Sequence, residues 1–329
     1  MSTEGGTKAI VAALGANLGI AITKLLAFLL TGMSSMLAEA IHSFADSGNQ
    51  VLLLIGGKRA RRDATPEHPF GYGRERYIYG FIVSIVLFSV GGLFALYEAY
   101  HKWHESHTGH GESPGVHQAW WWVPLLVLVV AIGLESMSFR TAIRESNPQR
   151  GSASWVQFIR GAKAPELPVI LLEDFAALIG LVFALFGVLL AVLTENAVWD
   201  AIGTGLIGAL LVSVAVVLAI EMKSLLLGES AAPSTVRAIT QAIEASAGVD
   251  RIIHLKTLHL GPEELLVAAK IAISGADRGA QIAATIDDCE RRARDAVPEL
   301  DLVVYLEPDL DRAGRPTGAH PRRHADEVQ

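Results

Sequence analysis

The chain has 329 residues, of which 51% are hydrophobic and only 19% are charged, and its formal net charge is −7. Soluble domains carry about 25% charged residues on average, and here the apolar residues gather in long runs that end near residue 222. The single cysteine, Cys289, excludes an intramolecular disulfide and a zinc site built from several thiolates. A single soluble domain, a disordered chain and a secreted disulfide scaffold are therefore excluded, and the negative charge gives no support for nucleic-acid binding.

Six apolar runs are each long enough to cross a membrane as a helix, which takes about 20 residues. Backbone groups find no hydrogen-bond partner in lipid, so such runs must form helices. We therefore expect an all-α, six-helix transmembrane domain over residues 1–225. Its spans are Ile10–Thr31, Ser34–Gly57, Tyr77–Tyr100, Ala119–Ala142, Pro168–Thr194 and Val198–Met222.

Lysine and arginine are distributed unevenly between the connections. The connection after the second span holds six of them and the one after the fourth span holds four, whereas the one after the third span holds only Lys102. Cytoplasmic loops are enriched in Lys and Arg, so both termini are expected in the cytoplasm. These loops fit a bacterial inner membrane, although an organelle membrane would have similar ones.

The remainder of the chain has the pattern of a small cytoplasmic α+β domain, expected over residues 230–311, followed by a disordered tail at 312–329. Its apolar spacing alternates between helical and extended periods. The expected elements are a helix at 234–247 with Ser234 as N-cap, a hairpin of Ile252–Leu260 and Leu265–Ile273, a helix with apolar positions from Ile282 to Val297, and a strand at Leu302–Leu306.

Ionisable side chains within the spans are the main clue to function, because each costs about 2.5–3.5 kcal/mol at mid-membrane. His42 and Asp46 lie four residues apart in the middle of the second span and share a helix face. Glu173 and Asp174 are adjacent in the fifth span and point about 100° apart, so at most one faces the same site squarely. The spans also hold Asn17 and Glu135 and, toward helix ends where long side chains can snorkel to the interface, Lys24, Glu98, Arg140, Asp200 and Glu221.

One imidazole and two or three carboxylates on two packed helices predict a divalent-cation site. Imidazole suits Zn²⁺, Fe²⁺, Co²⁺ and Ni²⁺, and carboxylate suits Mn²⁺. Histidine titrates near neutral pH and binds metal only when deprotonated, so one site holds either protons or a metal ion. This exclusivity favours proton-coupled antiport. The alternative explanation for these charges is an internal salt bridge, for example between Lys24 and Asp46.

Two segments resemble a known family. Residues 38–50, AEAIHSFADSGNQ, resemble the second-span signature of the cation diffusion facilitator (cation efflux) family, and residues 66–74, PEHPFGYGR, resemble the loop that follows it. The resemblance implies six spans, a ferredoxin-like or metallochaperone-like cytoplasmic domain, and a homodimer. It also implies export of a divalent metal, with zinc as the first expectation, in exchange for protons.

The same resemblance implies metal ligands at His42 and Asp46 on the second span and at Asp174 on the fifth. Ile170 stands where the family commonly has a histidine, and Glu173 is the candidate to replace it. This departure leaves open an alternative function, a membrane metal sensor or scaffold that does not transport. No Ser-His-Asp set or HExxH motif supports an enzyme.

Accessory metal sites are less well supported by the sequence. In the loop after the second span, His68 matches a metal-binding histidine of some family members, but Tyr72 stands where a second would be. In the small domain, Tyr305 and Glu307 occupy the last of the metal-sensing positions, so dimerisation is expected as its main role, with a metal site as the alternative.

Five of the 11 histidines lie between the third and fourth spans, in a segment expected to be a flexible outer loop. Histidine-rich tracts can chelate metal weakly. The segment is interpreted either as a metal contact after release or as a solvated spacer. The histidines are His101, His104, His107, His110 and His117.

Overall fold

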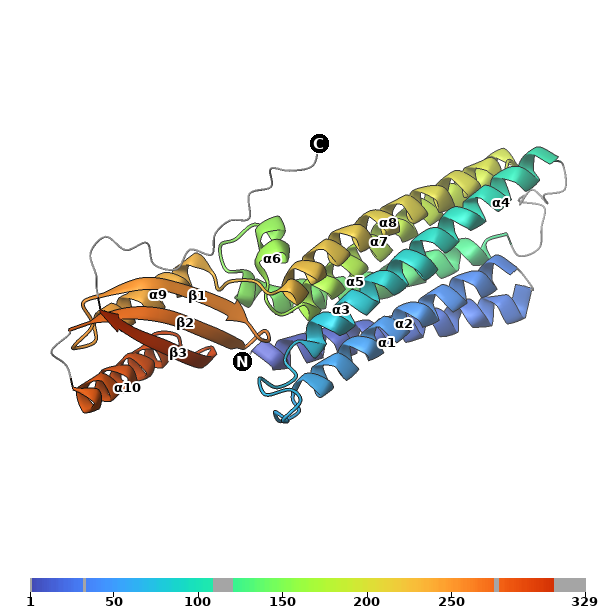
Figure 1. Ribbon diagram of the computed structural model, residues 1–329. Helices are drawn as coiled ribbons and strands as arrows, with labels where there is room; N and C mark the ends of the chain where they lie inside the picture. The colour runs from blue at the N-terminus through green and yellow to red at the C-terminus, as the bar shows by residue number, and fades with distance from the viewer. Residues whose placement is uncertain (1, 32–33, 109–120, 275–277, 311–329) are drawn as a thin grey trace, which may run out of the picture. The chain divides into compact units, whose positions relative to one another are not determined.

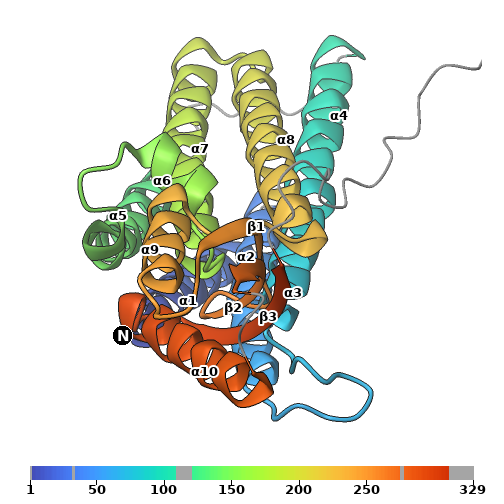
Figure 2. The same cartoon turned by 60° about the vertical axis from the view of Figure 1, so that its left-hand side comes forward.

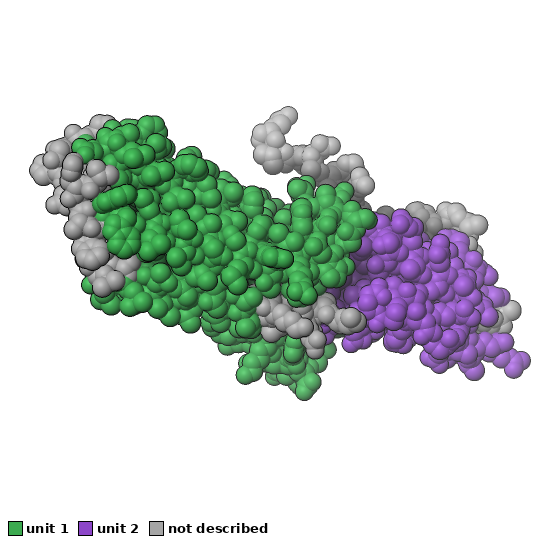
Figure 3. Space-filling model, turned by 180° about the vertical axis from the view of Figure 1, so that it is seen from behind, with its two compact units in different colours: residues 1–227 green, residues 228–329 purple. Residues whose placement is uncertain are grey.

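The computed structural model describes residues 2–31, 34–108, 121–274 and 278–310. The chain divides into two compact units, Met1–Leu227 and Gly228–Gln329, which Figure 3 shows in different colours. The first unit is helical, and the second combines a three-stranded sheet with two helices (Figures 1 and 2). Each unit has its own hydrophobic core.

The first unit is a bundle of long helices joined by short connections (Figure 1). A π-helical segment, η1, continues one helix into the next without a break. The elements are α1 (Ser2–Thr31), α2 (Ser34–Ala60), α3 (Glu75–Val86), η1 (Leu87–Leu93), α4 (Phe94–Thr108), α5 (Val123–Arg150), α6 (Trp155–Gly161), α7 (Glu166–Thr194) and α8 (Val198–Leu227).

Four helices of the described residues are long and apolar enough to cross a membrane. They are the continuous helix Glu75–Ser106, α5, α7 and α8, while α1 contributes a shorter apolar stretch, Ile10–Leu26. Four of the six expected spans thus have the required length and composition. Spans one and two are helical, but their crossing of the membrane stays a prediction.

Two parts of the bundle differ from the sequence-based expectation. The third span is longer than predicted, because the helix continues through α4 to Thr108. The short helix α6 was not predicted, since a single apolar turn gives too weak a periodic signal. Its start is fixed by a capping box, in which the Ser154 hydroxyl accepts from the Gln157 amide and the Gln157 side chain accepts from the Ser154 amide.

Glycines set the close contact between α7 and α8. A Cβ added at Gly203 would lie 3.0 Å from the carbonyl oxygen of Phe183 and 3.4 Å from the Cα of Gly187. Lipid gives helices no hydrophobic reason to associate, so close backbone approach at small residues is a main source of packing energy. The two helices can therefore pack at this distance only while position 203 has no side chain.

The second unit has the predicted order helix, strand, strand, helix, strand. Strand β1 pairs antiparallel with β2, and β2 pairs parallel with β3, so the sheet order is β1-β2-β3. The elements are α9 (Pro233–Glu244), β1 (Arg251–His259), β2 (Glu264–Ile273), α10 (Gly279–Ala296) and β3 (Asp301–Leu310).

The prediction of Ser234 as N-cap of the first helix here was wrong. The N-cap is Ala232, and Pro233 occupies the first helical position. Proline suits that position because its φ is already helical and its missing N–H would have no partner there. The last strand also extends further than the predicted Leu302–Leu306.

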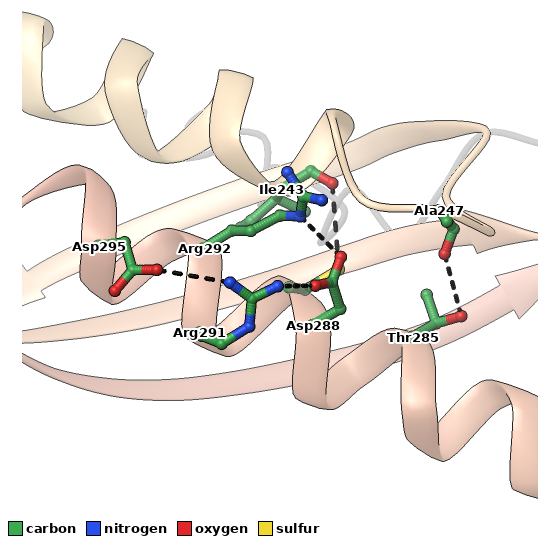
Figure 4. A network of polar contacts seen from close by, with 8 residues as sticks. Ile243, Ala247, Thr285, Asp288, Arg291, Arg292 and Asp295 are labelled. Carbon is green, nitrogen blue, oxygen red and sulfur yellow. Dashed lines mark hydrogen bonds and ion pairs between the residues drawn. The ribbon is translucent and has the colours of Figure 1, made fainter.

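The core of the second unit lies where α9 and α10 meet the sheet. Ile239 and Ile243 of α9 are fully buried, as are Leu265 of β2 and Cys289 of α10. Polar contacts at the surface of α10 link it to the turn that follows α9 and also form within α10 itself (Figure 4). The Thr285 hydroxyl donates to the carbonyl of Ala247 at 3.2 Å, and the side chain of Asp288 pairs with Arg291 and Arg292 on its own helix.

Replacing Gly203 with leucine is expected to destabilise the helical unit by roughly 1–3 kcal/mol, because the new side chain forces α7 and α8 apart. The measurement is the melting temperature of the detergent-purified protein. Gly133→Leu on α5 is the matched control, since a Cβ there meets nothing within 4 Å. Equal melting temperatures for the two variants would contradict this account of the contact.

Glu264 predicts a pH dependence of the second unit. Burial, followed by the charges of Asp301 and Glu263, raises the pKa of Glu264 above its ordinary value of 4.5. The folded state therefore holds this proton more tightly than the unfolded state does. The resulting destabilisation is present above the folded pKa and is lost as the pH falls through the folded pKa to below the unfolded one.

Glu264→Gln should accordingly increase the stability of this unit near neutral pH, and the gain over wild type should vanish below a pH of about 4. Hydrogen exchange of the β2 amides in the full chain, corrected for the intrinsic rate, measures the difference. Glu299→Gln, at an exposed position, is the control. A gain that does not change with pH would rule out the ionisation of Glu264 as the cause.

Candidate functional site

A cavity of about 60 Å³ lies among the helices of the first unit. Helices α1, α2, α5, α7 and α8 and the segment η1 contribute to its wall, which is apolar apart from six side chains. Three carboxylates and one ammonium give this polar lining an excess of negative charge when all are ionised. The six polar residues are Asn17, Lys24, Ser43, Asp46, Glu135 and Glu173.

Glu173 is fixed in the wall by two amides from α2. Asn49 donates to its Oε1 at 3.0 Å and Gln50 donates to its Oε2 at 3.1 Å. Gln50 in turn accepts a hydrogen bond from Asn17 of α1 at 3.3 Å. The chain Asn17–Gln50–Glu173 therefore ties three helices together, and it orients a carboxylate that is only 3% exposed.

Asp174 has different surroundings, as adjacent positions on a helix require. Its Oδ2 accepts a hydrogen bond from Ser138 of α5 at 2.8 Å, and its Oδ1 is buried with no hydrogen-bond partner among the described residues. Only one of the pair faces the cavity, because Glu173 lines it and Asp174 does not. A buried carboxylate oxygen without a donor costs free energy, so this oxygen of Asp174 is a candidate acceptor that the described residues leave unused.

Lys24 does not reach the helix end, contrary to the snorkelling interpretation. It is 4% exposed, lines the cavity, and donates to the Ser43 hydroxyl at 3.0 Å. Neighbouring helices cover it, so its ammonium is held among the acidic residues instead of extending to the interface. Asp200 and Glu221, at the ends of α8, instead form ion pairs with Lys102 and Arg160.

The second-span pair is only partly described. Asp46 lines the cavity and is partly exposed to it, while the side chain of His42 lies outside the described residues. Among the side chains that are described, no three histidines, cysteines or carboxylates lie close enough together to hold a metal ion.

A buried ion pair lies between α3 and α7. The guanidinium of Arg76 binds the carboxylate of Glu166 through two nitrogens, with Nη2–Oε2 at 2.8 Å. Bidentate pairing of this kind satisfies both charges in an apolar surrounding. It accounts for two charged residues that do not face the cavity.

The accessory positions have other partners. The rings of His68 and Tyr72 lie against each other with centroids 4.7 Å apart. In the second unit, His259 is buried and its Nδ1 contacts the Gly261 carbonyl at 3.2 Å. Glu307, one of the expected metal-sensing positions, pairs with Lys270 at 3.0 Å.

All five outer histidines were expected in a loop, but the structure places some of them on a helix. His101 and His104 are on α4, exposed, and next to Tyr97 and Tyr100 one turn earlier. The backbone of His107 is on the same helix, but its side chain, His110 and His117 lie outside the described residues. Helical spacing places His101 and His104 about one turn apart.

Comparison with known proteins decides the family. Residues 10–227 match the cation efflux transmembrane domain. The chain belongs to the cation efflux family. This assignment bears out the resemblance of the second-span motif and makes the helical unit a membrane domain.

Relatives of this cation efflux protein include one named proton-coupled zinc antiporter SLC30A9, mitochondrial, from Xenopus laevis, 30% identical over 84% of this chain and 48% of the relative. The human protein of the same name is 29% identical over 77% of this chain and 43% of its own. Metal tolerance protein C4 of Arabidopsis thaliana is 27% identical over 73% of this chain and 51% of its own. The chain spans about half the length of these relatives.

Gln50→Leu is expected to destabilise this cation efflux protein by roughly 1–3 kcal/mol for each buried polar group left without its partner, namely the carboxylate of Glu173 and the amide of Asn17. The melting temperature in detergent measures the loss. Ser47→Ala on the same helix is the control, because its hydroxyl bonds only to the carbonyl of Ser43 one turn earlier. A variant as stable as the control would mean that the three-helix chain is dispensable.

Proposed function

We propose that this chain is a divalent-cation efflux transporter that exchanges a metal ion for protons at the cavity of the helical unit. The observation that carries the proposal is the acidic lining, with Asp46, Glu135 and Glu173 around one cavity inside an apolar bundle. Charged groups are rare within spans and usually mark ion pathways. Family membership and the names of the relatives support cation movement as the activity.

The proposed binding groups are the imidazole of His42 and the carboxylates of Asp46, Glu173 and Asp174. Glu173 presents an oriented carboxylate to the cavity, and Asp174, outside the cavity lining, has one oxygen with no hydrogen-bond partner among the described residues. Imidazole with carboxylates suits zinc, and it also fits manganese, iron, cobalt and nickel in their divalent states. We take zinc as the first candidate because two of the relatives are named zinc antiporters.

Proton coupling follows from the chemistry of the same groups. Metal binding needs ionised carboxylates and a neutral imidazole, so a proton on any of them opposes the metal. If the site binds metal while open to one side of the membrane and protons while open to the other, each cycle exchanges the two ions. The relative's designation as a proton-coupled antiporter supports this step.

The membrane arrangement is part of the proposal. Helices α1 and α2 complete six spans, and the connections α2–α3 and α5–α7, which carry most of the Lys and Arg, face the cytoplasm together with both termini. The second unit pairs two copies into a homodimer. A bacterial inner membrane remains the expected location, although the SLC30A9 relatives are named mitochondrial.

A second candidate function is a metal sensor or scaffold of the same fold that binds but does not transport. One observation favours it: Ile170, which stands where the family commonly has a histidine, is fully buried in the apolar core. The fifth helix then offers only its two carboxylates. Metal binding without metal movement separates this candidate from the transporter.

The test uses the full chain in proteoliposomes with an acidic interior, where an antiporter should take up external Zn²⁺ while protons leave. Asp46→Ala should reduce uptake to the level of empty liposomes, because it removes a carboxylate from the cavity wall. Asp63→Ala, in an exposed loop, is the control and should match wild type. An ionophore that collapses the proton gradient should abolish the gradient-driven part of the uptake.

Four outcomes would contradict parts of the proposal. Uptake of none of the five metals would eliminate the transporter, and Zn²⁺ binding without uptake would favour the sensor. Normal uptake by Asp46→Ala would remove the cavity as the site. Uptake that is indifferent to the proton gradient would leave efflux but eliminate antiport.

A further inference from the structure

Glu135 of α5 is a buried acid for which the hydrogen-bond network provides no partner. It is 1% exposed and lines the cavity. The two adjacent carboxylates in the middle of α7, by contrast, have donors: Asn49 and Gln50 donate to Glu173, and Ser138 donates to Asp174. Within the described part of the chain, no hydrogen bond reaches the carboxylate of Glu135.

Its electrostatic surroundings make that position more costly. Among the described side chains, Asp46, Glu173 and Asp174 all act on Glu135 with like charge, and only the ammonium of Lys24 opposes them. That ammonium already donates to Ser43. A buried carboxylate without compensation is strongly unfavourable, and one lysine does not balance this group of acids. A cation in the cavity would.

The cavity has room for such an ion. A space of about 60 Å³ exceeds the roughly 10–15 Å³ that one water needs, so a metal ion with part of its water shell fits between the walls. Asp46 comes from α2, Glu173 from α7 and Glu135 from α5. A cation there would lie in a space that carboxylates from three separate helices line, and direct contact with all three would need them to move closer together.

We propose that Glu135 is a cation-binding residue of this cavity, which gives the site a carboxylate from α5 in addition to those from α2 and α7. The inference rests on the proposed function, because it assumes that a divalent cation enters the cavity. It goes further by adding a third helix to the site. Cation binding would then join α5 to α2 and α7.

The experiment measures Zn²⁺ binding to the full chain in lipid nanodiscs by calorimetry. Glu135→Gln keeps the shape of the side chain and removes its charge, so Zn²⁺ affinity should fall at least about tenfold, the lower end of what even supporting residues contribute to metal sites. Glu135→Asp restores the carboxylate and should recover part of the loss. Glu145→Gln, on the same helix but away from the cavity lining, is the matched control and should bind as wild type does.

Asp46→Ala separates this inference from the proposed function. If wild type binds Zn²⁺, Asp46→Ala loses it and Glu135→Gln binds normally, Glu135 is not a cation-binding residue and the proposed function stands. If wild type neither binds nor transports any of the five metals, the proposed function fails and the inference fails with it.

A second measurement needs no variant and so does not depend on Glu135→Gln folding. Dicyclohexylcarbodiimide modifies carboxyl groups in apolar surroundings, and mass spectrometry of the peptide containing Glu135 quantifies the product. Saturating Zn²⁺ should protect Glu135 from modification. Equal modification with and without Zn²⁺ would overturn the proposal.

Discussion

The structure depends on one constraint: charges enclosed by apolar helices must be compensated where they lie. Helices α1, α2, α3, α5 and α7 each bury at least one polar side chain, and most of these are matched by a partner from another helix. Side-chain amides of α2 donate hydrogen bonds to Glu173 of α7, a serine of α5 donates to Asp174, and an arginine of α3 pairs with Glu166. Because every such pair joins two helices, the same contacts that neutralise charge also fix which helices are neighbours.

This constraint separates structural charges from the charges of the site. In the pairs Arg76–Glu166 and Lys102–Asp200 the acid and the base compensate each other's charge. The cavity differs because its acids outnumber its single lysine. Because the acidic excess of the cavity lies in an apolar surrounding, it attracts a positively charged ligand.

Sequence periodicity was enough to locate the long helices and the small α+β unit, because apolar runs and alternations are local signals. The motif holding His42 and Asp46 was equally readable, since two residues one turn apart share a face whatever surrounds them. The sequence did not predict that Lys24 is buried in the cavity wall, nor that Glu135 lines the same cavity. Both depend on which neighbouring helices cover a position, and no single-helix pattern contains that information.

The same limit explains the difference between Glu173 and Asp174. The sequence indicates that adjacent acids point in different directions, but it cannot say which of them meets the cavity. That is decided by Asn49, Gln50 and Ser138, which belong to other helices. Long-range packing thus turns two chemically similar acids into one lining residue and one supporting residue.

The π-helical segment η1 gives the long helix Glu75–Ser106 an unusual mechanical property. A π-turn holds one residue more than an α-turn, and such bulges often occur at functional sites. When a bulge of this kind moves along a helix, each residue it passes rotates by about 100° while the two ends stay in place. Leu87, at the start of η1, lies in the cavity wall, so a shift of the bulge would exchange the side chain facing the cavity without bending or unfolding the helix.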